Sequence, residues 1–566
     1  MSAAILKMKK QGILRVAPLT PSFISPLFLV SKNDGSARPI FNLKALNRYV
    51  KVEPFHLINM QRIPAFLQPR DYLSKIDLSQ AYCHLSITET QRRFLRLAYD
   101  KEILEMTCLP FGLATAPKAF SMLTNWVAQF LRNRHYIRIL VYLDDYLIAH
   151  QNANVLREHV KITVEVLESL GWQINYEKSV LCPKKSLVYL GIQWQPWDNQ
   201  KSLTSEKIVH IIGTVESVLL QGKITLKSAQ KIVGLLNFAS FAVPRGRLNH
   251  RHLLLLKILL ESKGQKKAVP LPQKVIDELV WWRTNCQLTT PIHYPPPTNY
   301  LATDASGQAW GCQLNNVALS GNWRKQELYL HSNQKEMLAI LYAIRSHAHI
   351  LRHSSTLIQC DNRTVVAYLK NEGGTRSPPL LTLARQILEL IDQYKIHMTI
   401  FHIPGRYNSQ ADHLSRHRRP PEWHLLPTCV NKIFAKWGVP MIDLFASKTA
   451  HVVNSYVSRD LRDVEALFHD AFSAPWNFPL AWVFPPPFLV PRVLSHLNQS
   501  TGVYLLIVPR WEKVFWRADL KTRALEAPMT LRHLDTQMID TSTGRPPPKV
   551  EDLILEAWRC GAGPRQ

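Results

Sequence analysis

The stretch His135–His150, which reads HYIRILVYLDDYLIAH, decides the fold of the first part of the chain. Two runs of apolar and β-branched residues flank the adjacent acids Asp144 and Asp145. This pattern predicts a β-hairpin whose acidic pair lies at or beside the turn. Two neighbouring carboxylates between apolar strands are costly unless positive charge compensates them. A bare Asp-Asp pair also occurs in ordinary turns, so the flanking sequence has to decide its role.

Further motifs precede and follow this hairpin in a fixed order. Upstream, Ser74–Ile87 (SKIDLSQAYCHLSI) places Asp77 at the end of a short strand, and Leu109–Phe120 (LPFGLATAPKAF) leads into a helix. Downstream lie Gly171–Ser179 (GWQINYEKS) and Tyr189–Trp194 (YLGIQW). The order and content of the set favour a functional acidic pair over an ordinary turn.

The ordered set resembles the palm motifs of reverse transcriptases from about residue 14 to residue 260, with YLDD as the catalytic hairpin. The resemblance implies a right-hand polymerase with fingers, palm and thumb. Phosphoryl transfer by such an enzyme uses two divalent cations, and hard cations prefer carboxylate oxygen. We therefore expect Asp77 and Asp144 to bridge two Mg²⁺ or Mn²⁺ ions, with Asp145 as an accessory ligand.

The same resemblance assigns residues to the incoming deoxynucleoside triphosphate. Tyr82 stands where the family keeps an aromatic steric gate that excludes a ribose 2′-OH. Lys32 and Arg38, in VSKNDGSARPI, are expected to grip the triphosphate. Lys178 matches the lysine proposed as general acid for pyrophosphate. For Lys32 and Lys178, a plain surface position is the alternative.

The chain departs from the reverse transcriptase pattern at a few positions. Asn42 and Lys44 stand where the family often carries an acidic residue and an arginine, and Phe111 stands where many members carry a polar or aromatic residue. None of these positions is an expected metal ligand. The first two leave the affinity for the nucleotide open.

A second set of acids lies within residues 298–417. Strand patterns over 300–314 and 356–362, and a helix pattern over 331–350, place acids at two strand ends and two helix beginnings: Asp304, Glu336, Asp361 and Asp412. The arrangement resembles the ribonuclease H (RNase H) of retroelements, whose four metal ligands match these positions one by one. The resemblance implies a second pair of Mg²⁺ or Mn²⁺ ions and cleavage of the RNA strand of an RNA–DNA hybrid.

Two of these acids have competing interpretations. Asn333 followed three residues later by Glu336 is a capping-box pattern, and Asp412 alone is an ordinary helix-start aspartate. The register of all four acids favours metal binding. Many RNases H also carry a histidine in the loop before the last acid. Here the loop is the short PGRYN, and His402 precedes it on an expected strand, so we expect a structural imidazole.

Two proline-rich stretches, Pro291–Pro297 (PIHYPPP) and Arg416–Pro421 (RHRRPP), divide the chain because such segments resist regular packing. We expect an α/β multidomain protein. The expected parts are fingers and palm over 1–204, thumb or connection helices over 205–297, an RNase H-like α/β domain over 298–417, and a C-terminal α/β-like domain over 418–566.

The C-terminal part carries neither acidic set. WGVPMIDLFAS (437–447), with GGTRS (373–377) and ADHLSR (411–416), resembles DIRS-type retrotransposons, with a Gypsy-type element as the alternative. The corresponding DIRS region has been likened to DNA adenine methyltransferases, which hold the target amine with an Asp/Asn-Pro-Pro-aromatic loop. The segment 485–488 (PPPF) lacks the acid or amide, and no clear glycine-rich loop precedes it. We expect an inactive methyltransferase-like domain, or a binding or folding module.

Composition points to nucleic acid as the partner. Lys and Arg number 69 against 42 Asp and Glu, a formal charge of +27 that a polyanion would compensate. We expect an RNA template, a DNA primer and their hybrid as partners. The longest apolar runs fall short of the roughly 20 residues that cross a bilayer, so we expect no membrane partner. Eight scattered cysteines without a C-x-x-C pair predict reduced thiols in an intracellular protein, in cytoplasm or nucleus, rather than a secreted one.

An alternative function is a catalytically inactive nucleic-acid-binding protein derived from a retroelement. The presence of all seven expected acids argues against such decay.

The charge excess predicts that binding to nucleic acid weakens steeply with salt, because each neutralised phosphate releases counterions. Plotted as log affinity against log salt, the slope should be about −0.7 to −0.9 per phosphate contacted. Fluorescence anisotropy with a labelled RNA–DNA hybrid at several salt concentrations measures it. An affinity that does not change with salt would show that the charge serves another purpose.

Overall fold

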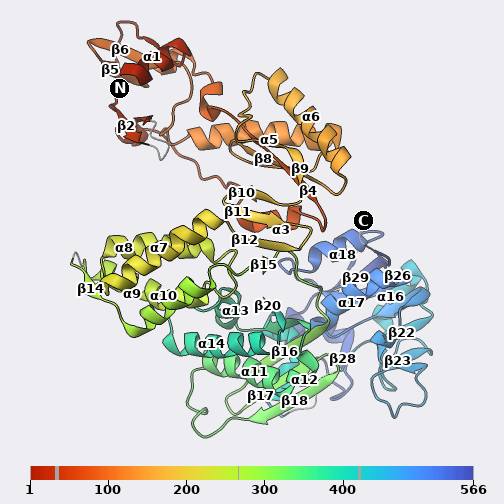
Figure 1. Cartoon of the computed structure of the whole chain (residues 1–566). Helices are drawn as coiled ribbons and strands as arrows, with labels where there is room; N and C mark the ends of the chain where they lie inside the picture. The colour runs from red at the N-terminus through yellow and green to blue at the C-terminus, as the bar shows by residue number, and fades with distance from the viewer. Residues whose placement is uncertain (1, 32–36, 265–266, 418–421, 565–566) are drawn as a thin grey trace. The chain divides into compact units, whose positions relative to one another are not determined.

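The computed structural model describes residues 2–31, 37–264, 267–417 and 422–564 (Figure 1). The chain forms two compact units. Unit 1 comprises residues 1–220, 238–244 and 281–293, and unit 2 comprises residues 221–237, 245–280 and 294–566. The α/β organisation expected from the sequence is confirmed within each unit.

Unit 1 contains the expected acidic hairpin inside a four-stranded antiparallel sheet of order β7-β8-β4-β9. Its strands are β4 (Tyr72–Asp77), β7 (Ile139–Tyr142), β8 (Asp145–His150) and β9 (Val180–Lys184). Helices α5 (Ala116–His135) and α6 (Ala153–Ser169) share one apolar core with this sheet. Pro117 lies in the first turn of α5, where a missing N–H breaks no helical hydrogen bond. The Asn152 side chain caps α6 by accepting from the N–H groups of Asn154 and Val155. This framework fixes the hairpin that carries the acids.

A smaller sheet, of order β1-β6-β5, lies in the first part of unit 1. Its strands are β1 (Leu14–Val16), β5 (Arg96–Tyr99) and β6 (Glu102–Met106). Helix α1 (Ser2–Lys10) precedes β1, and strands β2 (Leu27–Ser31) and β3 (Ala37–Phe41) form a separate two-stranded hairpin. A third sheet, of order β10-β11-β12-β15, is built from β10 (Leu187–Tyr189), β11 (Ile192–Gln195), β12 (Gln200–Leu203) and β15 (Thr290–Pro291). Pro291, the first residue of the proline-rich stretch, therefore lies on an edge strand, where its missing N–H breaks no ladder.

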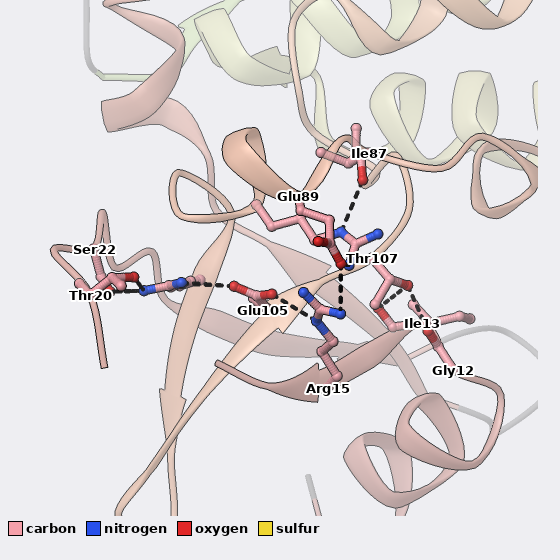
Figure 2. Close-up of polar contacts among 11 residues, drawn as sticks. Gly12, Ile13, Arg15, Thr20, Ser22, Ile87, Glu89, Glu105 and Thr107 are labelled. Atoms are coloured by element: carbon pink, nitrogen blue, oxygen red, sulfur yellow. Dashed lines mark hydrogen bonds and ion pairs between the residues drawn. The ribbon is translucent and has the colours of Figure 1, made fainter. Parts of the chain in front are cut away.

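Glu105 on β6 is buried, with 1% of its surface exposed, and is held between two arginines. Arg15 Nε donates to one carboxylate oxygen at 2.8 Å, and Arg96 Nη2 lies 2.9 Å from the other (Figure 2). Arg96 also donates to Thr20 and Ser22. A buried carboxylate is tolerated only when such partners satisfy it.

Removing the central carboxylate should therefore destabilise unit 1. Glu105→Ala leaves the buried Arg96 unpaired, and we expect a loss of about 3 kcal/mol or more in the free energy of unfolding. Chemical denaturation checks this value. The control is Glu102→Ala, which breaks the more exposed ion pair between Glu102 and Lys9. It should lower the free energy of unfolding by less than about 1 kcal/mol. Equal effects of the two substitutions would contradict the role of burial.

The expected helices between residues 205 and 290 are present. They are α7 (Ser205–Gln221), α8 (Leu226–Ala239), α9 (Arg251–Ser262) and α10 (Gln273–Asn285).

The RNase H-like region of unit 2 is a five-stranded sheet of order β18-β17-β16-β19-β20. Strands β16 (Asn299–Ala305), β17 (Ala309–Leu314) and β18 (Val317–Asn322) are antiparallel, and β19 (Ser355–Cys360) and β20 (His397–His402) run parallel to β16. Helices α11 (Ser332–Ser346), α13 (Arg363–Lys370) and α14 (Pro378–Gln393) bury one face of the sheet.

The other face of this sheet packs on the C-terminal region. Because side chains alternate along a strand, Leu301 points into the helical core while Tyr300 and Ala302 point the opposite way. Tyr300 and Ala302 belong to a core that also contains Leu505 and Ile507. Helix α15 (Ser409–Ser415) contributes Ala411 to the same core. The RNase H-like and C-terminal regions thus share buried apolar surface.

The C-terminal region is a seven-stranded sheet of order β24-β23-β22-β25-β26-β29-β27. Strands β22 (Ile442–Ala446), β23 (Tyr456–Ser458), β24 (Phe468–His469), β25 (Asn477–Val483) and β26 (Thr501–Pro509) are parallel, and β29 (Leu555–Gly561) is antiparallel between β26 and β27 (Met529–Leu531). Helices α16 (Pro427–Trp437), α17 (Val490–His496) and α18 (Arg517–Arg523) cover the two faces. The strand order reverses between β22 and β25.

None of the eight cysteines forms a disulfide, as the sequence predicts. Within the described ranges, no helix combines the length and hydropathy needed to cross a membrane.

Candidate active sites

The first acidic site is assembled by the pairing of β4 with β8. Asp77 and Asp145 are direct partners across these antiparallel strands. Asp144 precedes Asp145 in the hairpin turn, and its carbonyl accepts the Leu78 N–H at 3.0 Å. Leu143, with a φ of 54°, makes the turn that brings Asp144 next to the strand end. The hairpin therefore gathers the three expected acids at one place.

The electrostatics of this site fit a bound cation. Burial raises the pKa of Asp145 to about 6; Lys75 opposes the rise, and Asp144 and Asp77 add to it. Burial also raises the pKa of Asp144. Oδ1 of Asp145 is buried and accepts no hydrogen bond from a described residue, and Lys75 Nζ lies 3.7 Å away. Three carboxylates with an unsatisfied oxygen form a donor set that suits divalent metal.

Two expected nucleotide-site residues lie beside these acids. Tyr82, in the short helix η2 (Ala81–His84), is buried, and its ring centroid lies 4.8 Å from that of Phe111. Burial raises the pKa of Tyr82, and the Asp144 charge raises it further. Lys178 lies near enough to lower the pKa of Asp144. Phe111, one of the positions that differ from the family pattern, therefore packs against the expected gate residue Tyr82.

The other two nucleotide-site residues are not placed by the structure. Lys32 lies outside the described residues. Arg38 pairs with Val30 in the β2–β3 hairpin, but its side chain also lies outside the described part.

The second acidic site forms where two parallel strands end. Thr303 on β16 is paired with Cys360 on β19, so the next residues lie side by side: Asp304, which is still on β16 and is paired with Gly311, and Asp361, the first residue after β19. Glu336 extends from α11, and its carboxylate, Cys360 Sγ and the Asp361 carboxylate lie within 4.8 Å of one another.

The carboxyl groups of the second site influence one another strongly. Burial raises the pKa of Glu336 to about 9, with Asp304 and Asp361 adding to the rise. Burial raises the pKa of Asp304 to about 7, opposed by the Ser415 hydroxyl, which donates to it at 2.6 Å. Burial and the charge of Asp412 raise the pKa of Asp361. The structure thus brings the four expected acids together as a set of hard oxygen donors.

The capping-box interpretation of Glu336 is wrong. The N-cap of α11 is His331, and its side chain and that of Gln334 form the reciprocal capping bonds. Asn333 instead accepts a hydrogen bond from Asn362 at 2.7 Å. Glu336 is left free of any capping role and is buried, with 7% of its surface exposed.

The loop before the last acid approaches the site closely. A Cβ at Gly405 would lie 2.9 Å from Asp361 Oδ2, so the loop passes directly over that carboxylate. His402 ends β20, and its ring meets that of Trp511 edge-on at 6.5 Å. Asp412, on α15, is paired with Arg416 at 2.9 Å.

Sequence reasoning missed three residues that touch the acids. Lys75 was detectable, because alternation along β4 places it on the same face as Asp77. Ser415 and Cys360 carried no signal, since a hydroxyl and a thiol gain significance only from the strands and helix that bring them to Asp304 and Glu336.

Comparison with known proteins agrees with this arrangement. Residues 30–194 match the family model of reverse transcriptase (RNA-dependent DNA polymerase). Residues 296–391 match the model of the RNase H-like domain found in reverse transcriptase. The second match ends before Asp412.

The relatives that the chain resembles include viral and transposon polyproteins. The chain is 24% identical over 434 residues to a putative enzymatic polyprotein of Cassava vein mosaic virus, covering 70% of this chain and 61% of the relative. It is 25% identical over 427 residues to the transposon Tf2-3 polyprotein of Schizosaccharomyces pombe, covering 72% and 30%. The chain therefore spans less than two thirds of these relatives.

Among solved structures, a foamy viral protease–reverse transcriptase in complex with double-stranded DNA is 18% identical, with a TM-score of 0.47 and coverage of 71% of this chain and 69% of that one. The matched regions show that the chain carries a reverse transcriptase domain followed by an RNase H-like domain and is related to viral and transposon polyproteins.

Proposed function

We propose that this chain is an RNA-directed DNA polymerase with RNase H activity, which copies retroelement RNA into DNA and degrades the RNA strand of the resulting hybrid. The observation that carries the proposal is the presence of two clusters of buried and partly buried carboxylates. One lies within the reverse transcriptase match, and the other lies within the RNase H-like match except for Asp412. The proposed domains are residues 1–204, 205–297, 298–417 and 418–566, in an element of the DIRS type. Scattered free thiols support an intracellular location.

At the first site, Asp77, Asp144 and Asp145 would hold two Mg²⁺ or Mn²⁺ ions. When bound, such ions activate a hydroxyl nucleophile and stabilise the charge that develops on the transferred phosphoryl group. Lys178, whose charge lowers the pKa of Asp144, is proposed to donate a proton to the leaving pyrophosphate. Lys32 and Arg38 are proposed to bind the triphosphate. The RNA template, DNA primer and deoxynucleoside triphosphates are the proposed substrates.

At the second site, Asp304, Glu336, Asp361 and Asp412 would hold the ions that cleave RNA. Ser415 keeps one oxygen of Asp304 oriented by its hydrogen bond, and Gly405 allows the loop to approach Asp361. The raised pKa values of Asp304 and Glu336 show that the cluster is poorly compensated by the described cations alone.

The two sites should be separable by mutation, because each has its own ligands. Asp144→Asn should lower primer extension by about a thousandfold or more and leave hybrid cleavage near normal, and Asp361→Asn should do the reverse. Extension of a labelled primer on RNA and cleavage of a labelled hybrid, both with Mg²⁺ or Mn²⁺, measure the two activities.

The exposed Asp198→Asn serves as a control in both assays and should change neither. Loss of both activities in a folded, hybrid-binding Asp361→Asn protein would rule out two independent sites. Hybrid binding by the unaltered protein without either activity would favour the inactive binding protein instead.

Tyr82 should exclude ribonucleotides, because a ring beneath the sugar leaves no room for the 2′-OH. Tyr82→Ala should raise the incorporation of ribonucleotides relative to deoxynucleotides, measured as a ratio of kcat/KM values. Tyr49→Ala, which alters a tyrosine with 82% of its surface exposed, should leave the ratio unchanged. If Tyr82→Ala, like the control, keeps the ratio of the original protein, the assignment of Tyr82 as the gate is wrong.

Gly405 should be required for RNA cleavage but not for DNA synthesis. A methyl group at this position would press on Asp361 Oδ2, and Gly405→Ala should slow hybrid cleavage by up to about a hundredfold through a misplaced carboxylate. Gly307→Ala adds a methyl group where no atom lies within 4 Å and is the matched control. Cleavage at full rate by Gly405→Ala would show that Asp361 tolerates the displacement.

A further inference from the structure

A cavity of about 700 Å³ lies in unit 2, between the C-terminal sheet and the RNase H-like region. Its volume is in the range of sites for small ligands. Among the described residues that line it, none belongs to either acidic cluster. The polymerase and RNase H chemistry therefore leaves this cavity without a role.

The cavity lies where an open α/β sheet binds ligands. Its lining includes Ala446 and Ser447 at the end of β22, Arg459 and Asp460 after β23, and the segment Phe484–Pro487 after β25. These are the carboxyl ends of parallel strands, and the strand order reverses between β22 and β25. Ligands of such sheets bind outside the carboxyl ends at this reversal.

The lining chemistry selects against phosphate. Glu422, Asp460 and Asp470 place three carboxylates on the cavity, and Arg459 is the one cation among the described lining residues. The turn after β22, residues 446–453, contains no glycine, and Ser447 and Ala450 exchange their main-chain hydrogen bonds with each other. A pyrophosphate is normally bound by a glycine-rich turn at this position, so an anionic ligand is disfavoured.

The same lining suits a flat ring joined to hydroxyl groups. Phe445, Phe472 and Phe484 are half-buried aromatic residues of the lining. The Arg492 guanidinium lies over the Phe472 ring, 4.0 Å from its centroid, so Phe445 and Phe484 are the rings that remain for a ligand. Asp460 follows the second strand, where an acid accepts hydrogen bonds from ribose hydroxyls in such sheets. Arg462 donates to its Oδ1 from the main-chain N–H at 3.0 Å and from Nε at 2.9 Å, and to its Oδ2 from Nη2 at 2.8 Å. These bonds orient the carboxylate and leave a lone pair of Oδ2 for a further donor.

The rim of the cavity is rigid and attached to the RNase H-like region. Pro485, Pro486 and Pro487 fix the backbone after β25. The carbonyl of the next residue, Phe488, accepts a buried hydrogen bond of 2.6 Å from Gln359 on β19. A preformed rim of this kind reduces the entropy lost when a ligand is ordered.

We propose that this cavity binds a nucleoside without phosphate, its base against the phenylalanine rings and its ribose hydroxyls on Asp460. This site is independent of the polymerase and RNase H activities, so its test does not depend on them.

The experiment uses the full chain with EDTA present, which suppresses metal-dependent triphosphate binding at the two acidic sites. Ligand-observed NMR and calorimetry measure the binding of adenosine, guanosine, cytidine and uridine, each beside its triphosphate. We expect at least one nucleoside to bind more tightly than its triphosphate. Asp460→Asn and Phe484→Ala should each weaken that binding about tenfold.

Asp144→Asn and Asp535→Asn, which alter a polymerase acid and an exposed acid outside the cavity, should leave nucleoside binding unchanged. Circular dichroism of each variant establishes that it is folded, and the exposed position of Asp460 makes Asp460→Asn the safer variant. The proposal is overturned if no nucleoside binds at millimolar concentration. It is also overturned if folded Asp460→Asn and Phe484→Ala bind as the original protein does, or if the triphosphates bind more tightly at the same site.

Discussion

Both candidate sites depend on one constraint, the pairing of β-strands that carry aspartates at or next to their ends. Hydrogen bonds between β4 and β8 bring Asp77 against Asp145, and those between β16 and β19 bring Asp304 beside Asp361. The backbone thus forces like charges together. A carboxyl whose pKa is raised by folding makes the folded state less stable as pH rises above its ordinary pKa, because the native state then holds protons that the unfolded state has released. The surrounding apolar cores have to offset this cost, and divalent cations would relieve it.

Buried acids elsewhere in the chain show how different the two clusters are. Glu105 is buried as deeply as any of them, yet arginines satisfy both of its oxygens. Asp443, on β22, is also buried; burial raises its pKa to about 7, while the N–H groups of Phe445 and Val452 oppose the rise. At the two clusters, by contrast, neighbouring carboxylates add to the effect of burial. The charge of Glu105 is compensated by arginines of the chain, and Asp443 is isolated from other carboxylates, whereas the clustered acids are suited to compensation by a cation.

Much of this organisation could be predicted from the sequence because its signals are local. The β-branched runs around Asp144 define the hairpin, and the apolar spacing of 205–221 and 226–239 defines helices. The N-cap of α11 was mistaken because His331 is an unusual capping residue, while Asn333 and Glu336 imitate the common pattern. The contacts of Ser415 and Cys360 arise from distant segments, and so does the strand order of the C-terminal sheet, whose strands β23 and β24 are very short. Local periodicity carries no information on which strands become neighbours.

The core shared by the RNase H-like sheet and the C-terminal region has a consequence for how this chain can change over generations. Tyr300, Ala302 and Leu357 on one side and Leu505 and Ile507 on the other belong to one buried apolar core. A recombination event that exchanged one region alone would have to supply a matching apolar surface at the same moment. The two regions are therefore expected to be inherited as a single block, and substitutions on one side of the core should be accompanied by compensating substitutions on the other.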